Sequence, residues 1–129
     1  MQRFPLFPPT EAEARAGGQH VFDGWEYYIS PRRAHNPRSM KEMVWNSVDK
    51  MATFDAFRFI DMISPRPMLF ILGSKAVTKW METEAFERAK EPKELFWIEG
   101  ASHVDLYDKP EFVNPAVAKL SAFFQKGLD

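Results

Sequence analysis

The sequence predicts a mixed α/β protein built around a small parallel sheet. Residues 67–73 and 93–98 are short, mostly apolar runs bounded by proline or glycine, which is typical of strands buried on both faces. Helical patterns follow each of them, at residues 81–92 and 115–126. Because strands joined through a helix lie parallel in one sheet with a right-handed crossover, this order predicts a βαβ unit followed by a C-terminal helix.

The residues before the first strand give weaker signals. Thr10 and Glu13 have the spacing of a capping box, which predicts a short helix over about 10–16. Residues 20–33 are aromatic and turn-rich without a clear period, so we expect irregular chain there. Apolar side chains spaced by three and four over residues 40–63 predict an amphipathic helical region, divided in two by a break near residue 54.

The start of the C-terminal helix has a local signal of its own. Asn114 followed by Pro115 has the pattern of an N-cap and a first-turn proline. The length of 129 residues, 45% of them hydrophobic, predicts a single domain over 1–129. Within it we expect a mostly helical or irregular, cap-like segment at 1–64 and the βαβα part at 65–129.

Composition excludes several classes of protein. The formal net charge is −1, from 17 basic and 18 acidic residues, so no basic field predicts nucleic-acid binding. The chain has no cysteine, which excludes disulfides, thiolate nucleophiles and cysteine-bound zinc. No apolar run has the length of a signal peptide core or a membrane span. We therefore expect a cytoplasmic protein without a membrane partner.

Residues 64–128 resemble the C-terminal end of an α/β-hydrolase, of the dienelactone-hydrolase-like and acyl-esterase-like branch. The stretch EPKELFWIEGASHVDLYD (91–108) carries this resemblance most specifically. The resemblance implies that the loop after the last strand holds the catalytic histidine, which is His103, and that the loop after the preceding strand holds an acid. It also implies hydrolysis of an ester or thioester-like bond, without any cofactor or metal.

Other parts of the family's site have no counterpart in the sequence. No serine lies in the G-x-S-x-G frame of the nucleophile elbow. In the loop after Gly73, Val77 stands about where the acid is expected, and the next acidic residue is Glu82, inside the predicted helix. His103 is therefore the one catalytic residue that the resemblance assigns. We expect the chain not to be catalytic alone.

Residues near His103 leave alternatives open. Ser102 and Ser74 are substitute nucleophiles, and Ser74 is the better one because the ends of adjacent strands lie side by side. Asp105 and Asp108 could join His103 as metal ligands, but their spacing matches no distinctive metal site. We expect these two carboxylates to be caps or turn residues for the C-terminal helix instead.

A sheet of two parallel strands leaves one edge of strand 67–73 unpaired. We expect a homo-oligomer, most simply a dimer, to cover it. The methionines and aromatic residues of 40–63 predict a core or an interface, or a cap over a small acyl or ester ligand in a complete hydrolase. Three interpretations stay open: a hydrolase fragment without activity, an enzyme completed by another polypeptide or an unusual serine, and a non-catalytic oligomeric module for binding or assembly.

Overall fold

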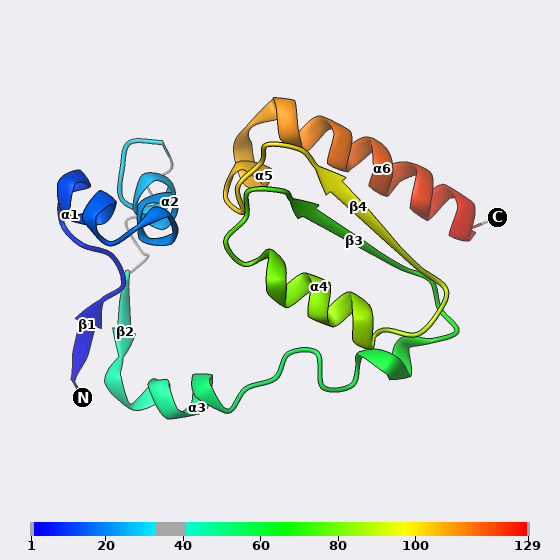
Figure 1. Cartoon of the computed structure of the whole chain (residues 1–129), viewed down its shortest axis with the longest axis horizontal. Coiled ribbons are helices and arrows are strands. Elements are labelled where there is room, and N and C mark those ends of the chain that lie inside the picture. The colour runs from blue at the N-terminus through cyan, green and yellow to red at the C-terminus, as the bar shows by residue number, and fades with distance from the viewer. Residues whose placement is uncertain (1, 33–40, 129) are drawn as a thin grey trace. The chain divides into compact units, whose positions relative to one another are not determined.

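The computed structural model describes residues 2–32 and 41–128. The chain forms two compact units, Met1–Asp55 and Ala56–Asp129, which Figure 1 shows together. The sequence predicted that the mostly helical or irregular segment ends at residue 64, nine residues beyond the boundary between the two units. The architecture is mixed α/β with a small parallel sheet, as predicted.

The first unit combines a small antiparallel sheet with short helices. Its elements are β1 (Arg3–Pro5), α1 (Glu11–Ala16), α2 (Gln19–Tyr28), β2 (Glu42–Val44), the 3-10 turn η1 (Trp45–Ser47) and α3 (Val48–Ala52). The predicted first helix is confirmed, because the Thr10 hydroxyl accepts from the Glu13 backbone and the Glu13 carboxylate accepts from the Thr10 backbone. These reciprocal bonds satisfy two amides at the start of α1.

The prediction of irregular chain over 20–33 is wrong for most of that range, where α2 forms. Gly18 has a φ of 92°, which turns the chain directly into the helix. The Phe7 ring packs so closely on Gly24 that a Cβ there would lie 2.2 Å from it, and Phe7 also stacks on Tyr28 at 5.5 Å between ring centroids. A distant aromatic residue therefore supports α2, and no local period reveals that contact.

The helical region expected over 40–63 is confirmed only in part. Residue 40 lies outside the described residues and β2 occupies 42–44, but η1 and α3 cover 45–52, η2 covers 60–63, and the predicted break near residue 54 falls between them. β2 pairs with β1 in the register Arg3 to Val44, and a contact between Phe4 and Trp45 continues the pairing at 5.4 Å between ring centroids. Pairing with a distant strand overrides the local pattern here.

The second unit contains the parallel sheet. Its elements are η2 (Ile60–Ile63), β3 (Met68–Gly73), α4 (Lys79–Arg88), β4 (Lys93–Ile98), α5 (Asp105–Asp108) and α6 (Pro110–Leu128). β3 and β4 run parallel with Met68 opposite Lys93 and Gly73 opposite Ile98, which confirms both strands and the crossover between them. In Figure 1, α4 and α6 lie on either side of the pair of strands.

The helices of this unit differ from the prediction at their ends. α4 begins at Lys79 and ends at Arg88, before the expected stop at Pro92. α6 begins at Pro110 rather than at Pro115, which lies inside the helix. Proline cannot donate to the carbonyl four residues earlier, so α6 forms with one intrahelical hydrogen bond missing there.

The core of the second unit lies where α4 meets β3. Ile60, Ala85 and Ala89 are buried together, and the rings of Phe70 and Phe86 meet edge to face with 5.5 Å between centroids. Ala85 lies on α4 and Ala89 directly follows it, and Met68 and Phe70 of β3 pack against this cluster. Over residues 2–32 and 41–128, no helix is long and apolar enough to cross a bilayer.

β3 pairs with a strand on one side only in the described part of the chain. The Met68 amide donates to Pro92 and the Ser74 amide to Ile98, at 3.1 and 3.0 Å. Backbone amides alternate in direction along a strand, so the even-numbered amides of β3 face β4 and those of Leu69 and Ile71 face outward. The outer edge of β3 is thus open within the described chain.

Gly73 is expected to be sensitive to substitution. An added Cβ would lie 2.3 Å from the carbonyl oxygen of Ala101, so the backbone must shift to accept alanine. We expect Gly73→Ala to lower the free energy of unfolding by about 1–3 kcal/mol in urea titrations. Gly127→Ala is the control, because a Cβ there meets no atom within 4 Å. Equal stability of Gly73→Ala and the wild type would contradict this expectation.

Candidate functional site

The loops that follow β3 and β4 are joined by three hydrogen bonds. The Ser74 amide donates to Ile98, the Lys75 amide donates to Ala101 at 2.9 Å, and the Gly100 amide donates to the Ser74 hydroxyl at 2.8 Å. Two of these bonds are between backbone groups, so they fix the path of both loops. The side chains of the two loops therefore meet at the carboxyl end of the sheet.

His103 lies in the second of these loops, half-buried, with a hydroxyl group at each ring nitrogen. The Thr78 hydroxyl, at the start of α4, is 3.4 Å from Nδ1. The Tyr107 hydroxyl, on α5, is 2.6 Å from Nε2, and the two rings meet edge to face with 5.3 Å between centroids. Both nitrogens of the imidazole thus have a neutral hydrogen-bonding partner.

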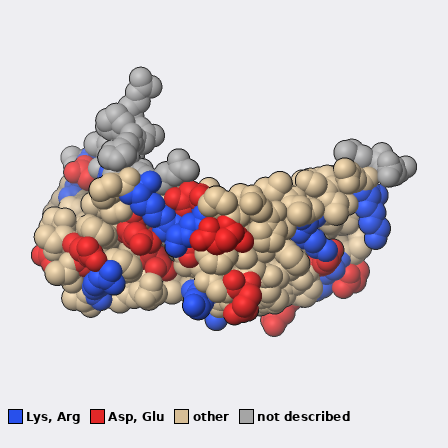
Figure 2. All heavy atoms as spheres, turned by 90° about the horizontal axis from the view of Figure 1, so that it is seen from above, with Lys and Arg blue, Asp and Glu red and all other residues tan. Residues whose placement is uncertain are grey.

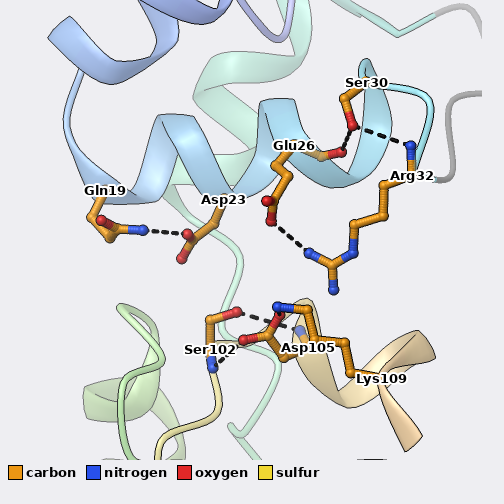
Figure 3. A network of polar contacts seen from close by, with 8 residues as sticks. All are labelled: Gln19, Asp23, Glu26, Ser30, Arg32, Ser102, Asp105 and Lys109. Carbon is orange, nitrogen blue, oxygen red and sulfur yellow. Dashed lines mark hydrogen bonds and ion pairs between the residues drawn. The ribbon is translucent and has the colours of Figure 1, made fainter.

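The short helix α5, which carries Tyr107, follows a turn held by reciprocal hydrogen bonds between Ser102 and Asp105. The Ser102 amide donates to Asp105 Oδ2 at 3.0 Å, and the Asp105 amide donates to the Ser102 hydroxyl at 3.3 Å. The Lys109 ammonium lies 2.7 Å from Asp105 Oδ1, and Figure 3 shows these three side chains together. Burial raises the pKa of Asp105, but hydrogen bonds from Lys109 and Ser102 outweigh it and lower the pKa to about 2.

The structure shows where the candidate catalytic and metal-binding residues from the sequence lie. His103 follows β4, as expected. Asp105 is the first residue of α5 and accepts from the Ser102 amide in the turn before that helix, rather than at the C-terminal helix where we expected it. Within the described residues, no group of side chains is arranged to hold a metal ion. The Ser102 hydroxyl accepts from the Asp105 amide and the Ser74 hydroxyl accepts from the Gly100 amide, whereas the hydroxyls at the imidazole of His103 are those of Thr78 and Tyr107. Asp108 is the last residue of α5.

Two residues of the site were missed by sequence reasoning. Tyr107 had a usable signal, because it follows His103 by four residues, a spacing that brings side chains together on a helical turn. Thr78 had none, since its position depends on the conformation of the loop after Gly73. The neighbouring Val77 stands at the expected position of the acid. Glu82, the next acidic residue, lies in α4 and has a buried Oε2 without a hydrogen-bond partner in the described chain.

A groove of about 540 Å³ opens at the opposite end of the sheet, where β3 and β4 begin. Met68, Lys93 and Glu94 line it together with Lys119 and Phe123 of α6. Lys119 is paired with Glu94.

On the face drawn in Figure 2, acidic and basic side chains are interspersed, so no region of one sign dominates that view.

Comparison with known proteins finds relatives that are longer than this chain. Uncharacterized protein YcjY of Escherichia coli K12 is 33% identical over 125 residues, which are 96% of this chain and 40% of that protein. Uncharacterized protein PA2218 of Pseudomonas aeruginosa is 34% identical over 128 residues, which are 96% of this chain and 34% of the relative. The chain thus spans about a third to two fifths of these relatives.

A solved structure has a similar fold. The crystal structure of hypothetical protein PA2218 from Pseudomonas aeruginosa matches 85% of this chain with a TM-score of 0.75 and 32% sequence identity. The match covers 35% of that chain. No family model matches the sequence.

The bonds of the Asp105 carboxylate to Ser102 and Lys109 should make the stability of this unit depend on pH. Because the pKa of Asp105 is lowered from 3.8 to about 2 on folding, its contribution is complete above about pH 4 and is lost as the pH falls through 2. We expect Asp105→Asn to lower the free energy of unfolding by about 2 kcal/mol at neutral pH. Urea titrations should show this difference closing between pH 4 and 2. A difference that stays constant over that range would contradict the assignment.

Proposed function

We propose that the chain is the C-terminal part of an α/β-hydrolase fold and supplies the general base for hydrolysis of an ester or thioester-like bond. The observation that carries this proposal is the position of His103. Its imidazole is held at the carboxyl end of a parallel sheet, between the loops that follow β3 and β4. In open α/β sheets this end is the usual place for ligands and catalytic side chains.

In the proposed reaction, Nε2 of His103 takes the proton from a serine hydroxyl as that oxygen attacks the acyl carbon. It then returns the proton to the leaving group. The serine comes from elsewhere, because this sequence has no G-x-S-x-G elbow. The relatives have additional chain outside the match, which leaves room for such an elbow. The absence of cysteine fits a reducing cytoplasm, which stays our expectation for its location.

The role of His103 can be tested by complementation. The chain is mixed with a polypeptide that carries the part of the Escherichia coli relative outside the match. Hydrolysis of a chromogenic acetyl ester and labelling by a fluorophosphonate are then followed. We expect His103→Ala to reduce hydrolysis by about 10²-fold or more, because the base is lost. His20→Ala is the matched control, since His20 is exposed on α2 in the first unit.

Each outcome of this experiment has a clear meaning. Hydrolysis that survives His103→Ala would exclude His103 as the base. A wild-type mixture that neither hydrolyses the ester nor reacts with the fluorophosphonate would instead favour the second candidate below. A stoichiometric adduct on the isolated chain would show that it contains its own nucleophile, and peptide mapping would identify the serine.

The second candidate is a non-catalytic oligomeric module for binding or assembly. The open outer edge of β3 favours it, because unpaired backbone groups beside apolar side chains promote pairing with another strand. The same unit also exposes large apolar side chains that a partner could cover: Phe59, Met62, Trp80, Trp97 and Phe124. A homodimer that pairs two copies of β3 would satisfy this edge.

Sedimentation at tens of micromolar tests the dimer. We expect Ile71→Pro to shift the chain toward monomer, because proline removes an outward amide of β3 and leaves the bonds to β4 in place. Ile71→Ala is the matched control, since it shortens the same side chain but keeps the amide. Circular dichroism of both variants verifies that the unit stays folded. A wild-type chain that is strictly monomeric at these concentrations would contradict the dimer.

A further inference from the structure

The two hydroxyl groups at His103 are not equivalent. The Tyr107 hydroxyl lies 2.6 Å from Nε2, within the range of a strong hydrogen bond, whereas the Thr78 hydroxyl lies 3.4 Å from Nδ1. A neutral imidazole has one nitrogen that donates and one that accepts, so these two contacts have opposite directions. The distances from the Tyr107 and Thr78 hydroxyls to the ring therefore indicate which ring nitrogen of His103 carries the proton.

The chemistry of the two hydroxyls decides the direction. A phenol is a stronger acid than an aliphatic alcohol and hence the better donor, while its oxygen is a weak acceptor because the lone pair is shared with the ring. The unprotonated imidazole nitrogen is a good acceptor. The short contact is thus best satisfied when Tyr107 donates to Nε2, which leaves the proton of His103 on Nδ1, facing Thr78.

We propose that Tyr107 and Thr78 are positioning residues that hold His103 as its Nδ1–H tautomer, with Tyr107 donating to Nε2 and Thr78 accepting from Nδ1. In this tautomer Nε2 is the acceptor, as a general base requires. The catalytic meaning of the tautomer rests on the proposed function, whereas the tautomer itself does not. Thr78 is thus the partner of Nδ1, the ring nitrogen that is hydrogen-bonded to a carboxylate in a Ser-His-Asp triad.

The Tyr107 hydroxyl also occupies the position beside Nε2 that a serine hydroxyl would take in the proposed reaction. A serine hydroxyl must donate to Nε2 in order to lose its proton, and in the proposed tautomer the Tyr107 hydroxyl, 2.6 Å from Nε2, already does so. The Tyr107 side chain is 47% exposed, so it can rotate into water when another hydroxyl arrives. The imidazole is therefore kept in the working tautomer before any partner binds, and Tyr107 is exchanged for the nucleophile without a change of tautomer.

Both positioning residues are themselves held in place. Tyr107 lies on α5, whose start is fixed by the reciprocal bonds between Ser102 and Asp105. Thr78 is the N-cap of α4, and its carbonyl accepts from the Met81 amide at 2.9 Å. The geometry around the ring is thus set by the helix starts on both sides of His103.

Nuclear magnetic resonance of the whole chain with ¹⁵N-labelled histidine tests the proposal. At mildly alkaline pH, where an imidazole is neutral, the ¹⁵N shifts and the proton–nitrogen couplings identify the protonated nitrogen. We expect the proton of His103 on Nδ1 in the wild type. Tyr107→Phe should shift the pattern toward a mixture of tautomers, and so should Thr78→Val. Thr78→Ser should retain the wild-type pattern because the acceptor is kept.

Tyr28→Phe is the matched control, because Tyr28 is an exposed tyrosine of the first unit and its hydroxyl should not affect the signals of His103. A second measurement uses diethylpyrocarbonate, which acylates an accessible neutral imidazole nitrogen. Tyr107→Phe should make His103 react several-fold faster, as mapped by mass spectrometry, whereas Tyr28→Phe should leave the rate unchanged.

A proton on Nε2 in the wild type would overturn the proposal, as would a pattern and a reaction rate that Tyr107→Phe leaves unchanged. These results are independent of ester hydrolysis. If the Nδ1–H tautomer is present but His103→Ala retains hydrolysis in the complemented enzyme, the proposed function fails and the assignment of the tautomer stands. If hydrolysis depends on His103 but the tautomer is wrong, only the role of Tyr107 and Thr78 fails.

Discussion

The close approach of the backbone at the carboxyl ends of β3 and β4 is the constraint on which the candidate site depends. The parallel register places Gly73 opposite Ile98, and the Ala101 carbonyl then passes where a side chain of residue 73 would be. That carbonyl accepts from the Lys75 amide, so the path of one loop is determined by the other. His103 and Thr78 meet because of this contact between loops.

The partners of His103 are hydroxyls, and this choice has consequences for its chemistry. A carboxylate beside an imidazole both orients the ring and stabilises the positive charge that forms when the ring takes up a proton. A hydroxyl orients the ring but supplies only a dipole. The two hydroxyls thus orient His103 but contribute only dipoles to it.

The elements that sequence predicted well are those whose signals are local. β3 and β4 are apolar runs between prolines and glycines, and α1 begins at a capping box, so each depends on neighbouring residues only. α2 is supported by Phe7, a contact that its own sequence does not reveal, and β2 depends on its pairing with β1, which overrides the local period of 40–63. The residues of the candidate site also differ in whether their positions depend on local or distant sequence. The position of His103 directly after a strand could be predicted from local sequence, whereas the position of Thr78 follows from a bond between distant loops.

Lys93 links the crossover helix to the strand that follows it. As the first residue of β4, it donates its ammonium protons to the carbonyls of Phe86 and Ala89 at the end of α4, at 2.7 and 2.8 Å, and lies over the Phe86 ring. The last turn of α4 cannot fray without releasing Lys93 from these carbonyls. The helix end and the strand start therefore open together, and their amide protons should exchange with solvent as one cooperative unit rather than residue by residue.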